Sequence, residues 1–186
     1  VHLGNLNATP AIVRSAVLYV LRVMVKEALP LNEGMMESVK IKLPSPSLLS
    51  PDFRKDSLEV PAVTGGNVET SQRLVSVLLR AFGLCAGSQP TMNNILFGTE
   101  NFGYYETVCG GAGAGPGYAG ADAVHSHMTN TRITDVEIIE HRYPVRIERF
   151  SIRKKSGGIG FWRGGDGVVR ELSFLEPMEL SVITQG

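Results

Sequence analysis

The stretch TMNNILFGTENFGYYETVCGGAGAGPGYAGADAVHSHMTNTR, from Thr91 to Arg132, is the segment around which the rest of the chain is organised. It holds eight glycines between Gly98 and Gly120, paired amides and a His-x-His step, with one arginine and no lysine. No helical period fits it, so we predict a long polar loop tethered by short strands. Loops of this length in a packed domain commonly serve binding or chemistry.

The composition bounds the class of protein. A chain of 186 residues, 43% of them hydrophobic, can bury one fair-sized core, and one domain is the expected number. Lysine and arginine number 18, as do aspartate and glutamate, so no net charge attracts nucleic acid or an anionic membrane. No apolar run reaches the roughly 18 residues that a membrane span requires. No secretory signal is predicted, and Cys85 and Cys109 lie outside any Cys-x-x-Cys spacing, which favours a cytoplasmic protein.

The first helix has a clear start signal. Thr9 supplies a capping hydroxyl and Pro10 a first-turn proline. From Ala11 to Ala28 the polar residues fall on one narrow stripe, so a mostly buried helix is predicted there, ended by the proline that follows. Beyond it, the alternation from Ser38 to Leu43 predicts a half-buried strand.

A second helix is predicted to begin at Asn67 or Thr70, either of which could act as its cap, and to run to about Phe82. Gly83 then closes it. Its buried face is expected to consist of four apolar residues, Leu74, Leu78, Ala81 and Phe82.

Strands dominate the last third of the chain. We predict strands from Thr134 to His141 and from Val145 to Arg153, with a bulge near Arg149. A hairpin is predicted from Val168–Leu175 and Met178–Thr184. The fold class is therefore α+β, with two buried helices and a mainly antiparallel sheet. Both ends of the sequence look cut, so residues 1–186 are expected to form one segment of a larger domain.

The glycine run Gly110 to Gly117 does not fit a known phosphate-binding loop. A dinucleotide fingerprint requires a helix start that Pro116 and Gly117 forbid, and a Walker A loop requires a Gly-Lys-Ser/Thr step that is absent. Two interpretations stay open: the glycines arrange backbone N–H groups as an anion nest, or they merely allow turns with positive φ.

The residues flanking this run are candidates for chemistry. His125 and His127 lie on one side of an extended segment and could share a metal, but nothing in the spacing selects further ligands. Such a pair more often makes hydrogen bonds, so no metal ligand is assigned. Glu106 could serve as a general base, or belong to an ordinary strand. Neither cysteine has a basic neighbour in sequence, so a thiol nucleophile is not favoured.

The residues from Asn67 to Arg73 admit two interpretations. A capping turn explains Asn67 and Glu69 but gives Arg73 no role. Alternatively, this helix start points at a carboxylate or phosphoryl oxygen of a ligand.

Taken in order, seven blocks of sequence resemble the hydantoinase B/5-oxoprolinase family over nearly the whole chain. They are GNLNAT (4–9), GNVETSQR (66–73), TMNN (91–94), YYET with the glycine loop (104–117), AVHSHMTNTR (123–132), ERF (148–150) and WRGGDGVVRE (162–171). The resemblance implies that this sequence matches the C-terminal part of the B-type subunit or domain.

The resemblance also implies an activity. An A-type partner binds ATP with Mg and phosphorylates 5-oxoproline or a hydantoin, and the B-type part hydrolyses the activated ring. The enzyme would be a hetero-oligomer or a fused homodimer, and any metal would lie in the N-terminal part of the B-type subunit. Two alternatives stay open: a subunit of an ATP-dependent acetone or acetophenone carboxylase, and a non-catalytic scaffold segment. The fragment alone is expected to be inactive.

The candidate site follows from these blocks. The expected catalytic residues are Glu106, His125 and His127. The expected substrate-binding residues are polar side chains and glycines of the same blocks: Asn67, Glu69, Thr70, Arg73, Asn93, Asn94, Tyr105, Gly111, Gly113, Asn130, Thr131 and Arg132.

Overall fold

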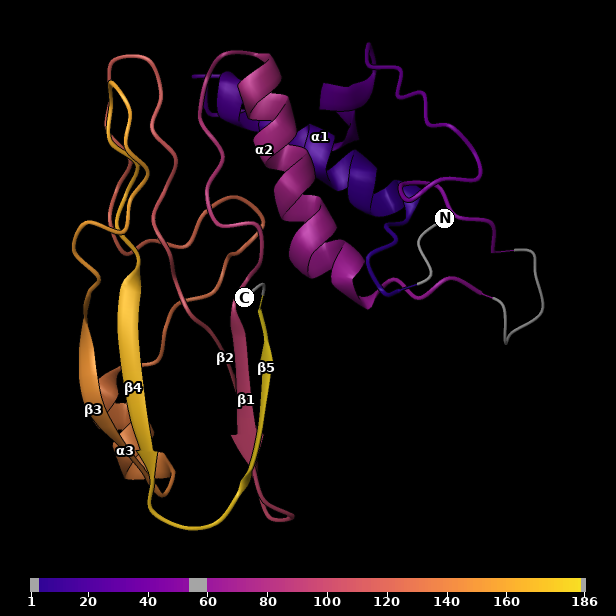
Figure 1. The fold of residues 1–186 in the computed structure, drawn as a ribbon. Helices are drawn as coiled ribbons and strands as arrows, with labels where there is room; N and C mark the ends of the chain where they lie inside the picture. Colours follow the sequence, from indigo (N-terminus) through magenta and orange to yellow (C-terminus); the bar gives the residue numbers. More distant parts are fainter. Residues whose placement is uncertain (1–3, 54–59, 185–186) are drawn as a thin grey trace. The chain divides into compact units, whose positions relative to one another are not determined.

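A computed structural model of the chain describes residues 4–53 and 60–184 (Figure 1). The chain divides into two compact units, the first ending at Gly83 and the second beginning at Leu84. Each is described by itself below. The expectation that residues 1–186 form one segment of a larger domain stays a prediction.

Helix α1 (Pro10–Met24) begins where the sequence predicted. The Thr9 hydroxyl accepts a hydrogen bond from the backbone N–H of Ile12 at 3.3 Å, which confirms Thr9 as the cap. The helix ends four residues before Ala28, because Val25 is extended and its N–H donates to the Arg22 carbonyl. The guanidinium of Arg22 donates to the Val25 carbonyl at 3.1 Å and completes this closure.

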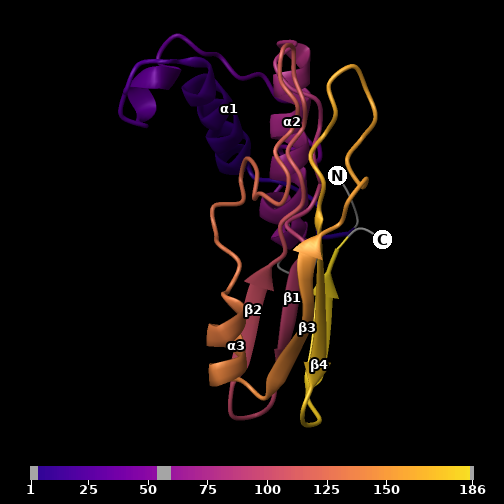
Figure 2. The ribbon, with the colours of Figure 1, turned by 90° about the vertical axis from the view of Figure 1, so that its left-hand side faces the viewer.

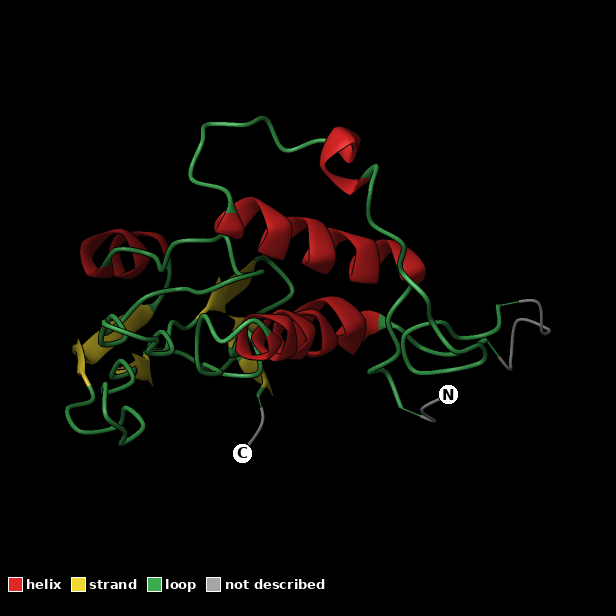
Figure 3. Ribbon diagram, turned by 90° about the horizontal axis from the view of Figure 1, so that it is seen from above, coloured by secondary structure: helices red, strands yellow, loops and turns green. Residues whose placement is uncertain are grey.

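The burial predicted around most of α1 is wrong. Its buried residues, Val13, Ala16 and Val20, form a single face at helical spacing, whereas Val23 and Met24 are 54% and 43% exposed. Helix α2 (Ser71–Ala81) packs against α1 (Figure 3). Ile12, Val17, Leu18 and Leu21 are half-buried, so only part of the apolar surface of α1 is covered by the described residues.

The second helix starts with a π-helical turn, η2 (Gly66–Thr70), that runs into α2. Neither predicted cap is used as a cap, because the Thr70 hydroxyl donates instead to the Leu6 carbonyl at 2.5 Å. The end at Gly83 is confirmed, with φ of 67°. The buried face is Gln72, Val75 and Leu79 rather than the predicted set, and Phe82 is 52% exposed.

The segment between these helices contains a short 3₁₀ helix, η1 (Glu33–Met36), and no strand at residues 25–53 or 60–65. Residues 38–43 do alternate between half-buried and exposed, as the sequence predicted. No β-ladder partner lies beside them among the described residues, so the predicted strand is wrong.

The second unit is built on two antiparallel sheets (Figures 1 and 2). In the three-stranded sheet, β1 (Asn94–Gly98) lies between β2 (Gly103–Thr107) and β5 (Glu179–Ile183). In the other, β3 (Val145–Ile152) pairs with β4 (Val168–Phe174). Together with three α-helices, these sheets confirm the α+β class.

Two strand predictions in this unit are wrong. Residues 136–142 form the helix α3 (Val136–Arg142) instead of a strand, because the Asp135 carboxylate caps it by accepting from the N–H groups of Glu137 and Ile138. Strands β4 and β5 exist but do not form a hairpin, since β5 pairs with β1. The predicted bulge is confirmed by the register shift between Ile147 and Arg149.

An aromatic core fills the second unit. Phe97 and Tyr104, on neighbouring strands, have ring centroids 4.7 Å apart. Tyr143 and Phe174 meet Phe97 edge-on at 6.1 and 5.4 Å, in geometries that aromatic pairs prefer. Ile139 of α3 and Val145 of β3 complete the fully buried part.

Two long loops, at 108–134 and 153–167, lie against each other above these sheets (Figures 2 and 3). Their backbones hydrogen-bond directly, as where the N–H of Gly165 donates to the Ala112 carbonyl at 2.9 Å. A Cβ added at Gly165 would lie 1.9 Å from the Ala121 carbonyl oxygen, and one at Gly111 would lie 2.0 Å from that of Gly165. These glycines therefore permit close backbone packing rather than positive φ.

Replacing Gly165 by alanine should destabilise the protein by roughly 1–3 kcal/mol, because the added carbon collides with backbone rather than with a movable side chain. Chemical denaturation measures this loss. Gly158→Ala is the matched control, since nothing lies within 4 Å of its added carbon. Equal stability of the two variants would contradict the packing described.

Candidate functional site

The second unit contains a cavity of about 680 Å³. Its walls come from four stretches of chain that are far apart in sequence. They are 86–93, 108–114, 153–168 and the end of the last strand at Thr184. The volume lies in the range of small-molecule sites.

Backbone forms much of the cavity wall, since ten of its 24 lining residues are glycines. The wall is held by hydrogen bonds between the stretches, such as that from the Ala86 N–H to the Ala114 carbonyl at 2.7 Å. Gly111 and Gly113, both predicted as substrate-binding residues, line it, as does Asn93. A ligand here would meet peptide groups as well as side chains.

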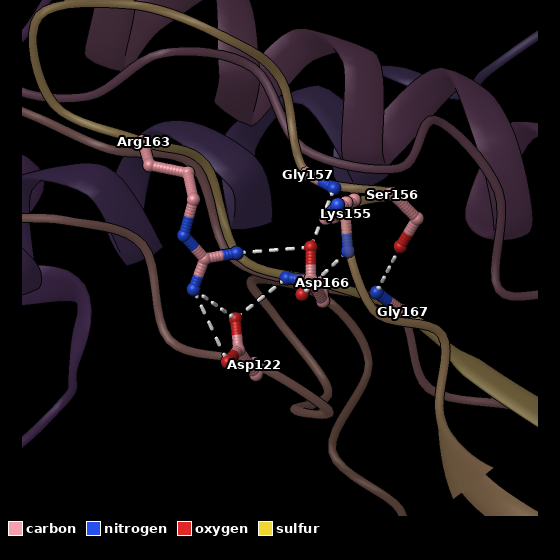
Figure 4. Close-up of polar contacts among 7 residues, drawn as sticks. All are labelled: Asp122, Lys155, Ser156, Gly157, Arg163, Asp166 and Gly167. Atoms are coloured by element: carbon pink, nitrogen blue, oxygen red, sulfur yellow. Dashed lines mark hydrogen bonds and ion pairs between the residues drawn. The ribbon is translucent and has the colours of Figure 1, made fainter.

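A charged network fixes the loop at 155–167 (Figure 4). The Asp122 carboxylate accepts from the backbone N–H of Asp166 at 2.7 Å and from the Arg163 guanidinium at 2.9 Å. Asp166 in turn accepts from the N–H groups of Gly157 and Lys155 at 2.7 and 3.0 Å. The Gly157 hydrogen bond is the main cause that lowers the pKa of Asp166. The network ties the two long loops into one wall.

Below the glycine loop, Glu106 and Arg170 form a buried ion pair. The side chains are each 1% exposed, and Nε of Arg170 lies 2.8 Å from Oε1 of Glu106. The other carboxylate oxygen, Oε2, accepts from the Tyr104 hydroxyl at 2.6 Å, the Thr134 N–H at 2.9 Å and Nη2 of Arg170 at 3.2 Å. Burial, and then this hydrogen bond to Glu106, raise the pKa of Tyr104.

Because its carboxylate is engaged on both oxygens, Glu106 is arranged to position its neighbours. Its predicted role as a general base stays a prediction. The Arg170 guanidinium also lies over the ring of Phe150, 4.8 Å from the centroid. The pair therefore joins β2 of one sheet to β3 and β4 of the other.

His125 lies directly after a short bridge that connects it to the glycine loop. The Val124 N–H donates to the Gly110 carbonyl at 2.9 Å. Both ring nitrogens of His125 are buried and have no hydrogen-bond partner among residues 4–53 and 60–184. Burial lowers the pKa of His125, and the charge of Glu106 partly opposes this. A neutral imidazole with a free nitrogen can accept a proton.

His127 is half-buried and has a backbone φ of 53°, which non-glycine residues seldom adopt. Burial lowers its pKa as well. Neither histidine lines the 680 Å³ cavity. His125 lies close to it in the chain, because the preceding residue, Val124, pairs with Gly110, which does line the cavity. Within the described part of the chain, no three histidine, cysteine or acidic side chains are grouped to hold a metal.

The other predicted residues lie in varied settings. Asn94 is buried and its amide donates to the Tyr105 hydroxyl, while Tyr105 itself is 55% exposed. Asn130, Thr131 and Arg132 are exposed, with Thr131 hydrogen-bonded to the Thr107 hydroxyl.

Four predicted residues belong to the first unit. On the turn η2 and the start of α2, Glu69 and Thr70 are buried, whereas Asn67 and Arg73 are exposed. Their substrate-binding role stays a prediction.

Sequence reasoning missed several residues that the structure brings to the site. Arg170 shares the inner face of β4 with Leu172 and Phe174. A charge at such a position is a readable signal of a buried ion pair. Gln89 and Arg153 line the cavity, and no local pattern marks them, because the cavity forms only when distant loops meet.

Comparisons with known proteins point to one protein family. The family model of hydantoinase B/oxoprolinase matches residues 1–186. A 5-oxoprolinase of Dictyostelium discoideum is 55% identical over 182 residues, which cover 98% of this chain and 14% of that protein. This chain thus spans a small part of that relative's length.

Two solved structures are similar in fold. An ATP-dependent caprolactamase from Pseudomonas jessenii has a TM-score of 0.74 at 26% identity, over 94% of this chain and 32% of that one. A nucleotide-free acetone carboxylase has a TM-score of 0.67 at 20% identity, over 88% of this chain and 23% of that one. The second likeness shows the fold alone. Among the described helices, none is long and apolar enough to cross a membrane.

Glu106→Gln should destabilise the protein by about 3–5 kcal/mol, because it leaves the Arg170 charge buried without its partner. Denaturant titration measures the free energy of unfolding. Glu171, which follows Arg170, is exposed. Glu171→Gln also removes one negative charge, and its free energy of unfolding should stay within about 0.5 kcal/mol of the parent protein. Similar losses in both variants would contradict the role of the pair.

The histidines predict a pH dependence of stability. Because burial lowers the pKa of His125 and His127 below the ordinary 6.5, the unfolded chain binds more protons than the folded one below that pH. This contribution to stability is therefore fully present above pH 6.5 and is lost as the pH falls below 6.5 through the lowered folded-state pKa values.

The free energy of unfolding, measured by heat or denaturant across this pH range, should decrease less with falling pH in a His125→Gln, His127→Gln double variant. The exposed His141, replaced in the same way, is the control. An unchanged decline in the double variant would contradict the buried, neutral state.

Proposed function

Since this chain belongs to the hydantoinase B/oxoprolinase family, we propose that it forms part of an ATP-dependent enzyme that opens a cyclic amide. The substrate is 5-oxoproline or a hydantoin, and this part acts on the phosphorylated intermediate. An A-type subunit or domain binds ATP with Mg and is the partner. The high identity to a 5-oxoprolinase supports the choice of reaction class.

The chemistry explains why such an enzyme needs ATP. A ring amide is a poor electrophile, and phosphorylation of its oxygen activates the ring carbon towards water. After water adds, the ring nitrogen must leave before the phosphate, because loss of phosphate first would only regenerate the amide. The ring C–N bond therefore breaks as nitrogen takes a proton, and a second water releases phosphate from the resulting acyl phosphate.

This sequence of steps needs a group that first accepts and then returns a proton. A neutral imidazole does both near neutral pH. His125 fits this role best, because burial keeps it neutral and its ring nitrogens are unpartnered among the described residues. His127 is the second candidate, and Glu106 positions the loop start through Arg170.

The phosphoryl oxygens need dipoles or positive charge. We assign this task to the glycine-built cavity wall, with Gly111, Gly113 and Asn93 among its lining residues. Thr131 and Arg132, and the helix start at Asn67, are further candidates carried by the family blocks.

One observation carries the proposal. Almost all of this chain aligns with part of a 5-oxoprolinase. In this chain, His125, whose ring nitrogens are buried, directly follows Val124, and Val124 pairs with Gly110 of the cavity wall. A base and a glycine-rich cavity thus occur in the same loop system.

The test is substrate-dependent ATP hydrolysis by the intact protein with its A-type partner. With 5-oxoproline or a hydantoin, ATP hydrolysis should rise and a ring-opened product should form. His125→Gln should lower product formation by about 10²-fold or more, whereas the exposed His141→Gln should not. Absence of stimulation by both ring classes would refute the proposal.

Two other outcomes identify the alternatives. Turnover that requires bicarbonate and a ketone would indicate a carboxylase instead. Unchanged turnover after alanine replacement of Glu106, His125 and His127, in properly folded protein, would indicate a scaffold.

A further inference from the structure

The cavity wall carries a single formal charge. Of its 24 lining residues, Arg153 is the only one that is basic, and none is acidic. Ten of the others are glycines, and the rest are uncharged: polar residues such as Ser88, Asn93 and Ser156, and apolar ones such as Val108, Ile159 and Trp162. The only lining thiol, Cys109, is kept protonated because burial raises its pKa. The interior therefore favours a ligand with a negative charge.

Arg153 differs from the two other arginines that follow it in the chain. Arg163 is paired with Asp122 and Asp166, and Arg170 with Glu106. The Arg153 guanidinium has neither an ion pair nor a hydrogen bond with any residue that the structure describes, while its backbone N–H is held by the Gly167 carbonyl at 2.8 Å. Arg153 is exposed where it lines the cavity, so its side chain is available to a ligand, on an anchored backbone.

A second, independent donor lies in the same wall. Gln89 accepts a hydrogen bond from the Asn93 amide at 3.1 Å through Oε1, which fixes the orientation of its own amide. Its Nε2 is buried and has no acceptor in the described ranges. Buried donors without acceptors are costly, so such an atom at a cavity indicates a ligand oxygen.

We propose that this cavity binds the oxyanion group of a small ligand, which pairs with Arg153 and accepts a hydrogen bond from Nε2 of Gln89. A planar guanidinium suits a carboxylate or a phosphoryl group, both of which present two oxygens. The identity of the ligand as the ring substrate or its phosphorylated form rests on the proposed function. The carboxylate of 5-oxoproline and a phosphoryl group are the two sources of this chemistry.

Binding measured without ATP separates these sources. We would titrate the intact protein by calorimetry with 5-oxoproline, with 2-pyrrolidinone, which is the same ring without the carboxylate, and with inorganic phosphate. At least one of the two anions should bind, and 2-pyrrolidinone should bind on the order of tenfold more weakly or not at all. The anion that binds identifies the source.

Variants locate the binding in this cavity. Arg153→Gln should weaken anion binding about tenfold or more, and Gln89→Leu about threefold. Lys154→Gln removes the same charge from the adjacent residue, which is exposed like Arg153 but does not line the cavity, and should leave binding unchanged. Thermal unfolding confirms that each variant is folded.

Three results would overturn the inference: no binding of either anion, equal binding of 2-pyrrolidinone and 5-oxoproline, or equal losses in the Arg153 and Lys154 variants. These outcomes are separate from the ATP hydrolysis assay. Anion binding without substrate-stimulated ATP hydrolysis would uphold the site and refute only the proposed function.

Discussion

The buried ion pair between Glu106 and Arg170 is the interaction on which the second unit depends. It links β2 to β4, which belong to different sheets, and the same carboxylate accepts from Tyr104 and from the chain before α3. Charges this far from water persist because they are paired with each other, and Oε2 of Glu106 also accepts hydrogen bonds. The pair therefore fixes the end of β2, and the glycine loop that leaves this strand starts from a defined position.

A second constraint acts above the sheets, where loop backbones pack directly on one another. Side chains would separate the loops at Gly111 and Gly165, and the charged network of Asp122, Arg163 and Asp166 locks the arrangement. A wall made of peptide groups presents fixed dipoles, which suits the recognition of oxygen-rich anions. Gly111 and Gly165 thus allow the loop backbones to pack closely, and both residues line the cavity.

Local signals could be read from the sequence, and contacts between distant residues could not. Thr9-Pro10, Gly83 and the bulge near Arg149 follow from capping and alternation, which involve only neighbouring residues. Alternation failed for α3, where the Asp135 cap outweighed it. It found β5 but not its partner, because β5 pairs with β1, and the paired residues Asn94 and Ile183 are 89 positions apart (183 − 94). The family blocks pointed to His125 and the glycine loop. Gln89 and Arg153 could not be identified from the sequence, because the cavity that they line is formed by stretches far apart in the chain.

We propose that this chain takes part in opening the phosphorylated ring and not in phosphorylating it. A rapid-quench single turnover of the intact assembly, with the His125→Gln variant and excess enzyme over ATP, tests it most directly. The account predicts ADP formation at the parental rate with ring-opened product delayed or absent, because only the later step needs this proton transfer. Loss of both ADP and product, or parental formation of both, would contradict it.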